Sequence, residues 1–415
     1  MENKKSSWYG PKQIGMMIYT AIIFLIGTSI IGGNNNTVFP MFAEIRGWDI
    51  NLINAVSGIG CILKAIGVLV LAKVVRKSGA KNLTVITLFI SAALLIVFGV
   101  TENLPIYLVV ILALGFLGGG YEKNGGMTLT ANWWPTKKGI VLGFTTMGIV
   151  AMNIVYVPMM PKLLAKFGLG GGMAVIAAIL VVVAIITILF VKNNPEEVGE
   201  YPDGDPTYAV KGAEVAQMMK EYKSPFTLKK VCADKNTWFI GLSSAFAFMA
   251  VMSYIASAIP AMMSYGYDYN LATTIFAVGG IMGIIGSFLF GVIDQKLGTK
   301  KAFIIYFVCI IIGFIFTLLM PKGAIFCWLA GVIIFAAQGA LCNLLPSYVA
   351  TVYGRWDYTS GYQVIGTIFE IGAGVGVMMT GFFANMAIMY TFDIVMLVIG
   401  FIMMVLSSDK FIGKR

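Results

Sequence analysis

The sequence predicts an all-α integral membrane protein with twelve transmembrane helices in two six-helix, pseudo-symmetric bundles. Hydrophobic residues make up 59% of the 415 residues and charged residues only 12%, about half the charged share of a soluble domain. Twelve apolar runs approach the roughly 20 residues that cross a hydrocarbon core, and one polar stretch separates six runs from six. The expected spans are 14–33, 50–72, 82–100, 104–130, 139–161, 170–191, 236–263, 270–293, 302–320, 323–350, 359–384 and 388–407.

A short basic turn between the fourth and fifth runs predicts the orientation. Lys137 and Lys138 lie in this turn, within the stretch TLTANWWPTKKG that follows Met127. Basic residues in short loops are retained on the cytoplasmic side, so we expect the turn and both termini to be cytoplasmic. With this orientation most basic residues fall in cytoplasmic segments, which explains the net charge of +10 without a nucleic-acid partner. The predicted location is the cytoplasmic (inner) membrane, with several passes.

The polar stretch at 192–235 predicts the domain organisation. It is rich in charge, proline and turn residues, as in NNPEEVGEYPDGD, so we expect a cytoplasmic linker. One short surface helix is expected within it, near Ala213 to Glu221. The linker separates an N-terminal bundle at 1–191 from a C-terminal bundle at 236–415.

The two predicted bundles repeat each other in sequence. LAKVVRKSGAKN after the second span and GVIDQKLGTKKA after the eighth both place a glycine between basic residues. NWWPTKKG, between spans four and five, corresponds in position to YGRWDYTSG between spans ten and eleven. Two parallel six-helix repeats resemble the major facilitator superfamily, and the resemblance implies a substrate site between the halves near the midplane.

Two short segments carry a finer resemblance. WWPTKKG, followed by Gly143, and NNPEEVGEYPDGD look like the oxalate/formate antiporter family of that superfamily. The superfamily's signature loop is altered here, because Arg76 stands where an acidic residue is expected and Asp294 is shifted by one position. Oxalate-type members use an arginine in span eight and a lysine in span eleven. Here span eight has no basic residue and span eleven carries Glu370, so a monocarboxylate is a better expected substrate than oxalate.

Charged residues inside the predicted spans are the first site candidates, because a charge near the bilayer centre costs at least about 2.5–3.5 kcal/mol. Lys64 and Glu122 lie at similar depth and could pair, either permanently or as a pair that breaks and reforms. Glu122 and Lys123 point about 100° apart on a helix, so both cannot face one cavity. If Glu122 is paired within its bundle, Lys123 is the expected free cation that attracts a substrate anion. A lysine that snorkels to the membrane interface is the alternative.

Glu370 lies near the middle of an otherwise uncharged span. A carboxylate at this depth suits proton coupling, unless it holds a substrate amine or pairs with Lys64 or Lys123 across the cavity as a gate. Asp49 and Asp393 lie near span ends, where we expect them to reach water. The chain has no histidine, so a proton relay must use Glu122, Glu370 or a peripheral aspartate. The proposed coupling and gating residues are Glu122, Glu370, Lys64 and Asp294.

Neutral polar side chains in the spans could hydrogen-bond a substrate head group, although bonds between helices are the ordinary alternative. Together with Lys123 and Glu370, the predicted substrate-binding residues are Asn34, Asn35, Tyr121, Asn124, Tyr156, Tyr254, Gln338 and Gln363.

The sequence shows no nucleotide-binding loop, metal-ligand cluster or nucleophile elbow, so we expect neither an enzyme nor a cofactor. We expect a secondary active transporter that moves a small, monocarboxylate-like organic anion by proton symport or anion exchange. A zwitterionic or cationic solute held by Glu370, and a sensor of the same fold that transports nothing, remain alternatives. The expected partners are the substrate, a proton or counter-anion and the lipid bilayer, and the expected state is a monomer.

Overall fold

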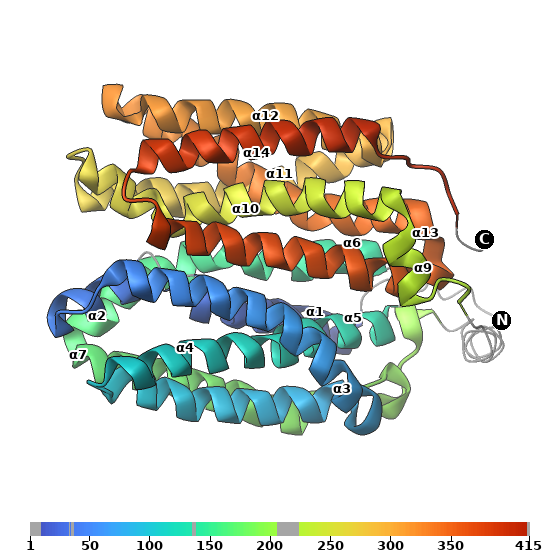
Figure 1. Cartoon of the computed structure of the whole chain (residues 1–415). Coiled ribbons are helices and arrows are strands. Elements are labelled where there is room, and N and C mark those ends of the chain that lie inside the picture. The colour runs from blue at the N-terminus through green and yellow to red at the C-terminus, as the bar shows by residue number, and fades with distance from the viewer. Residues whose placement is uncertain (1–9, 33, 35–36, 135–137, 206–223, 413–415) are drawn as a thin grey trace.

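A computed structural model of the chain describes residues 10–32, 34, 37–134, 138–205 and 224–412. These residues form a long helical bundle without strands, in which α1 begins and α14 finishes at the same end (Figure 1). We call this the terminal end and the other the distal end. The helices are α1 (Pro11–Ile31), α2 (Val38–Arg46), α3 (Ile50–Val100), α4 (Leu104–Gly118), η2 (Gly119–Gly126), α5 (Met127–Trp133), α6 (Lys138–Thr145), α7 (Met147–Phe190), η3 (Pro195–Val198), η4 (Pro202–Gly204), α9 (Leu228–Ala233), α10 (Lys235–Ser264), α11 (Tyr269–Leu297), α12 (Thr299–Leu319), η5 (Met320–Lys322), α13 (Ala324–Phe382) and α14 (Met386–Leu406).

Three of these helices fold back on themselves at a glycine. Gly79 in α3, Gly168 in α7 and Gly354 in α13 have φ values of 81°, 71° and 69°, a region that favours glycine. A Cβ added at Gly172 would meet the side chain of Leu164, so the two arms of α7 lie against each other beside the turn. Eleven described segments are long and apolar enough to cross a membrane, and one of them, Gly143–Phe190, contains the Gly168 turn. The helices therefore make twelve crossings, as the sequence predicts.

The two basic glycine turns adopt the same backbone conformation. Gly79 has φ 81° and ψ 160°, and Gly298, which joins α11 to α12, has φ 85° and ψ 152°. The repeated glycine therefore reflects a repeated left-handed turn. Asp294 accepts hydrogen bonds from Thr299 Oγ1 and Ser347 Oγ, both at 2.6 Å, and so ties together three helix ends within 236–415. The side chain of Arg76 lies outside the described residues.

The polar segment is only partly described. The helix expected near Ala213 to Glu221 lies outside the described residues, whereas α9, which the sequence analysis did not predict, follows at Leu228–Ala233. The first part of the segment packs against the terminal end. Asn193 Oδ1 accepts a hydrogen bond from Lys81 N at 2.9 Å, and Trp133 Nε1 donates to Lys192 O at 3.0 Å.

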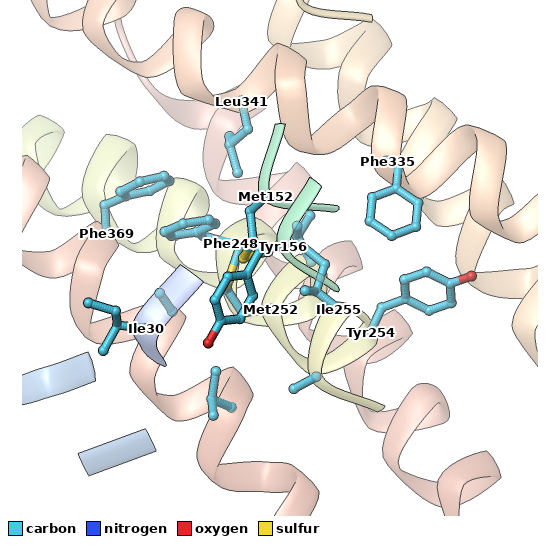
Figure 2. Packing of buried hydrophobic residues seen from close by; sticks show 14 of the residues in the cluster. Ile30, Met152, Tyr156, Phe248, Met252, Tyr254, Ile255, Phe335, Leu341 and Phe369 are labelled. Carbon is cyan, nitrogen blue, oxygen red and sulfur yellow. The ribbon is translucent and has the colours of Figure 1, made fainter. Parts of the chain in front are cut away.

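Close helix packing and an apolar cluster hold 11–191 against 235–406. At Gly58 of α3 an added Cβ would meet the backbone of Gly374 in α13, and at Gly381 it would meet Asn51 and Ala55. Aliphatic and aromatic side chains from both parts of the chain belong to one buried cluster (Figure 2). The labelled members are Ile30, Met152, Tyr156, Phe248, Met252, Tyr254, Ile255, Phe335, Leu341 and Phe369.

Candidate functional site

Four charged side chains form a continuous chain of alternating sign inside the bundle. Lys64 Nζ lies 2.5 Å from Glu122 Oε2, and Glu122 Oε1 lies 3.5 Å from Lys123 Nζ. Lys123 Nζ in turn lies 2.7 Å from Glu370 Oε1. Two cations and two carboxylates compensate one another, which lowers the cost of placing each charge at membrane depth. The structure thus brings together the four buried charges that the sequence singled out.

A π-helical segment positions the two central charges. Glu122 and Lys123 lie in η2, the sequence GGYEKNGG, which interrupts the expected fourth span between α4 and α5. Its glycines allow close approach, because a Cβ at Gly119 would meet the backbone of Lys64. π-helical turns are uncommon and frequently mark functional sites. The sequence predicts a continuous helix here, and the glycines on both sides of Tyr121–Asn124 are the one signal of an irregular segment.

Glu122 is enclosed on all sides. Its side chain is fully buried, and its carboxylate lies between Lys64 and Lys123. The space it occupies depends on a glycine in α1, because a Cβ at Gly27 would meet the Glu122 carboxylate and its Cβ. Phe24, one turn earlier on α1, places its ring 5.8 Å from Lys123 Nζ, within cation–π distance.

We expect Gly27→Ala to destabilise the protein, because the new methyl group would overlap the Glu122 side chain and displace it from both lysines. Overpacking costs about 1–3 kcal/mol, and weakening a buried ion pair adds to this. Gly15→Ala in the same helix is the matched control, since nothing lies within 4 Å of a Cβ added there. Melting temperatures of the two purified variants provide the measurement. Equal melting temperatures would show that Glu122 is not held as the structure indicates.

The ion pair between Lys123 and Glu370 joins two parts of the chain. Lys123 belongs to η2, and Glu370 belongs to the second arm of α13, at 355–382. The expectation that Lys123 is a free cation is therefore wrong in this conformation, because two carboxylates lie within 4 Å of its nitrogen. The alternative expectation, that Glu370 pairs with a lysine across the cavity, describes this arrangement, because a buried carboxylate without a cation is costly. The alternative of a snorkelling lysine does not hold either.

A small pocket lies against this ion pair. Its lining comes from α3, from Lys123 and Met127, and from α13, and its cavity volume is about 70 Å³. Ligand sites usually enclose about 300–1,000 Å³, so this pocket has room for a few atoms only and has to widen to admit a substrate. The residues that line it are Ala65, Val68, Leu69, Lys123, Met127, Tyr362, Gln363, Gly366, Thr367 and Glu370.

One face of α13 supplies four of the ten residues that line the pocket. Gln363, Gly366, Thr367 and Glu370 follow the i, i+3, i+4, i+7 spacing that places residues on one side of a helix. Gln363 is thus a predicted binding residue that lies beside the charged pair. Tyr362 and Thr367 were not predicted as site residues, although Thr367 lies one turn before Glu370 on the same helix.

The pocket lies on the terminal side of the close contact between α3 and α13. On the distal side, Gly58 and Ile62 of α3 pack against Gly374 of α13. On the terminal side, beginning at Ala65 and Glu370, the same two helices separate enough to line the pocket. The two helices are therefore closed toward the distal end, while the pocket extends toward the terminal end.

Several neutral candidates bond to other helices rather than face the pocket. Tyr156 Oη donates to Asn34 Oδ1 at 2.5 Å, and Asn34 Nδ2 donates to Ile30 O at 2.5 Å. Asn124 Nδ2 donates to Val68 O at 3.0 Å. Tyr121, which precedes Glu122 in the sequence, is fully buried and does not line the pocket. Asn35 lies outside the described residues.

Two further candidates lie on the side of residues 235–412. Tyr254 of α10 packs against Phe314 of α12 and Tyr390 of α14, with ring centroids 6.3 and 6.2 Å away, so it points away from the pocket. Gln338 Oε1 accepts a hydrogen bond of 3.2 Å from Asn153 Nδ2, and this bond joins α13 to α7. The remaining amide atoms, Asn153 Oδ1 and Gln338 Nε2, are buried without a hydrogen-bond partner in the described structure.

The expectation that Asp393 reaches water is wrong. Asp393 lies inside α14 and its side chain is fully buried. Its position close to the start of the last span suggested exposure, but α10 and α12 cover this part of α14. Residues 235–412 therefore contain a second deep carboxyl group besides Glu370. Asp49 is exposed as expected, and its side chain caps α3 by accepting from Asn51 N at 2.9 Å.

The fold and the buried charged site define a membrane transport protein rather than an enzyme. The sequence matches the Major Facilitator Superfamily over residues 17–377, and the chain therefore belongs to that superfamily. A comparison with curated protein sequences gave no match. The resemblance to the oxalate/formate antiporter family therefore stays an expectation.

The fold is similar to that of a solved bacterial transporter. One structure is a bacterial homologue of the human lysosomal transporter Spinster in an inward-facing, unoccupied conformation, with a TM-score of 0.70 at 15% identity, covering 98% of this chain and 100% of that chain. A second shows a bacterial homologue in an inward-facing, occupied conformation, with a TM-score of 0.70 at 14% identity, covering 97% of this chain and 98% of that chain. At this identity the comparison establishes the shared fold.

Proposed function

We propose that the protein is a secondary active transporter of a small, monocarboxylate-like organic anion in the cytoplasmic membrane, working as a proton symporter or an anion exchanger. The ion pair between Lys123 and Glu370 carries this proposal, because it places one cation and one carboxylate at the same pocket between two parts of the chain. Their side chains are 11% and 15% exposed, whereas that of Glu122 is 0% exposed. The ion pair between Lys123 and Glu370 is therefore the one that a ligand entering the pocket can reach.

The mechanism follows from an exchange of partners at Lys123. A substrate carboxylate that enters the pocket replaces Glu370 as the partner of the Lys123 ammonium group. Glu370 is then a carboxylate without a cation in an apolar site, and taking up a proton removes the cost of that charge. One anion and one proton are thus bound together, and the net charge of the site does not change. Lys64 and Glu122 remain paired within residues 11–191, so their charges compensate each other throughout the exchange.

The same ion pair couples binding to alternating access. With both termini in the cytoplasm, the pocket extends toward the cytoplasm and the contact of Gly58 with Gly374 closes the outer side. We propose that residues 1–191 and 236–415 rock against each other about the central site, with the polar segment 192–235 as the connection. When a substrate carboxylate takes the place of Glu370 beside Lys123, one attraction between the two halves is lost. A ligand that binds one conformation more tightly than the other shifts the population toward that conformation.

The number of cations favours one carboxylate over two. Among the described residues that line the pocket, Lys123 is the one basic side chain. A dicarboxylate such as oxalate would leave its second charge without a partner, which is costly away from water. The resemblance of WWPTKKG and NNPEEVGEYPDGD to the oxalate/formate antiporter family therefore supports its monocarboxylate-type members. A zwitterion is the competing substrate class, since Glu370 at the same pocket offers a partner for an amine.

A ligand screen tests the proposal. We expect small monocarboxylates such as acetate and lactate to raise the melting temperature of the purified protein, more strongly at about pH 5.5 than at pH 7.5, because the proposed exchange takes up one proton for each anion bound and a lower pH therefore favours binding. A ligand at 100 times its dissociation constant stabilises the folded state by about 2.7 kcal/mol. Stabilisation by amino acids or quaternary amines instead of acids would overturn the assignment to organic anions.

Lys123→Ala should remove the stabilisation by monocarboxylates at both pH values, since no other cation lines the described pocket. Lys166→Ala, which alters an exposed lysine, is the control and should respond as the wild type does. Because Lys123→Ala leaves Glu370 unpaired, the double variant Lys123→Ala/Glu370→Gln is measured beside it. Retained stabilisation by acids in both variants would contradict direct recognition by Lys123.

A further inference from the structure

A second carboxyl group lies deep in the bundle, away from the charged chain. Asp393 is the eighth residue of α14, and its side chain is 0% exposed. Its Oδ2 atom is hydrogen-bonded to Ser253 Oγ of α10. Its Oδ1 atom is buried and has no hydrogen-bond partner in the described structure. The group therefore lies within the contact between α10 and α14.

Among the described residues no basic side chain forms an ion pair with Asp393, and the charged chain of Lys64, Glu122, Lys123 and Glu370 does not include it. From α10, Ser253 bonds Asp393, and the buried ring of Tyr254 packs on Tyr390 of α14, whose Oη bonds Ser257 Oγ at 2.9 Å. From α12 the ring of Phe314 packs on Tyr390. The titratable groups next to Tyr390 are the phenol of Tyr265 and the thiol of Cys327. All of these groups are neutral near pH 7.

The hydrogen bonds of Ser253 indicate where a proton is needed. Its Oγ atom lies 2.9 Å from Ala250 O and also bonds Asp393 Oδ2. A hydroxyl group has one hydrogen to donate, and neither a carbonyl oxygen nor an ionised carboxylate can supply another. Both bonds are satisfied when Asp393 carries a proton, because its O–H then donates to Ser253 Oγ while Ser253 donates to Ala250 O. With an ionised Asp393, Ser253 has one hydrogen for two acceptors, so one of these two bonds is not made.

We propose that Asp393 is a proton-binding site, distinct from Glu370, which holds α14 against α10 as a neutral carboxylic acid. A proton fits this site better than a metal ion, because Ca²⁺ needs six to eight oxygen ligands and the neighbouring hydroxyl oxygens of Ser257 and Tyr390 already bond each other. The site needs no open cavity. It also lies one helix from the transport site, since Phe248 of α10 stacks on Phe369, the neighbour of Glu370, at a centroid distance of 4.1 Å.

Loss of the proton would place an uncompensated charge in the contact between α10 and α14. The native state holds the proton at pH values where the unfolded chain has released it, so the free energy of unfolding falls as the pH rises. Asp393→Asn keeps the size and the hydrogen-bonding capacity of the neutral acid and cannot ionise. The variant should therefore lose less stability than the wild type between about pH 6 and pH 9.

Infrared spectroscopy of the full-length protein in lipid tests the site directly. We expect a carboxylic-acid C=O stretching band near neutral pH that is retained in Glu370→Gln and absent in Asp393→Asn. Melting temperatures of the same three proteins across the pH range provide the second readout. An unchanged band in Asp393→Asn would overturn the proposal. If Asp393→Asn is less stable than the wild type by the same amount at every pH, the proposal would also be overturned, because the ionised carboxylate would then be the native form.

Discussion

Glu370→Gln is expected to abolish accumulation of substrate driven by a pH gradient while leaving exchange of substrate across the membrane. Glutamine keeps the shape of a protonated glutamate but cannot bind or release a proton, so the symport cycle loses its proton. A gradient of one pH unit corresponds to about 1.4 kcal/mol, and a transporter that moves one proton with one anion would accumulate substrate about tenfold. The variant should bring internal and external concentrations to equality. Uptake of labelled monocarboxylate into proteoliposomes, with and without a pH gradient, provides the measurement.

A matched control separates this effect from a general change in charge. Glu44→Gln alters an exposed glutamate in α2, outside the pocket lining, and should accumulate substrate as the wild type does. Accumulation by Glu370→Gln at the wild-type level would rule out Glu370 as the coupling group. Loss of both accumulation and exchange would instead indicate that Glu370 is the partner of the substrate itself, as a zwitterionic substrate requires.

Glu122→Gln is expected to cause the largest loss of stability of any single substitution in the charged chain. The side chain is fully buried and is the one partner that Lys64 has among the described ion pairs. Removing its charge leaves Lys64 uncompensated at membrane depth, and breaking a buried pair in this way costs about 3–5 kcal/mol. We expect a lower melting temperature and a lower yield of folded protein after detergent extraction.

The double variant Lys64→Met/Glu122→Gln tests the cause. Replacing both members of a buried ion pair by neutral groups of similar volume is often close to neutral. The double variant should therefore recover most of the stability lost in Glu122→Gln, because Lys123 keeps Glu370 as its partner. Additive losses would show that the two side chains act independently and would contradict the pairing.

The fold could be predicted from composition and repetition, because membrane-spanning segments have to be long, apolar and helical. The glycine turns at Gly79 and Gly298 could be recognised by their equal positions in two repeats, and the structure gives them nearly equal φ and ψ values. The choice of Lys64, Glu122, Lys123 and Glu370 followed from the cost of charges in lipid, and the four form one chain of ion pairs. Their transport roles stay predictions.

Helix rotation and three-dimensional packing could not be predicted from a single sequence. Lys123 lies in a π-helical segment, and α13 packs against α3 so that Glu370 reaches Lys123; neither fact follows from hydropathy. The same limit explains Asp393, whose burial depends on the helices that cover α14 rather than on its distance from the end of a span. Tyr254 was predicted to bind substrate because of the span in which it lies, yet its ring packs against α12 and α14.

Proton uptake on ligand binding tests the exchange of partners at Lys123 most directly. Purified protein in a weakly buffered solution near pH 7 is mixed with a saturating monocarboxylate that the ligand screen has identified, and the pH change is followed with an indicator dye. If the substrate carboxylate displaces Glu370 from Lys123, about one proton is taken up for each ligand bound, and Glu370→Gln takes up none. Tight binding of the acid by the wild-type protein without any proton uptake would contradict the account.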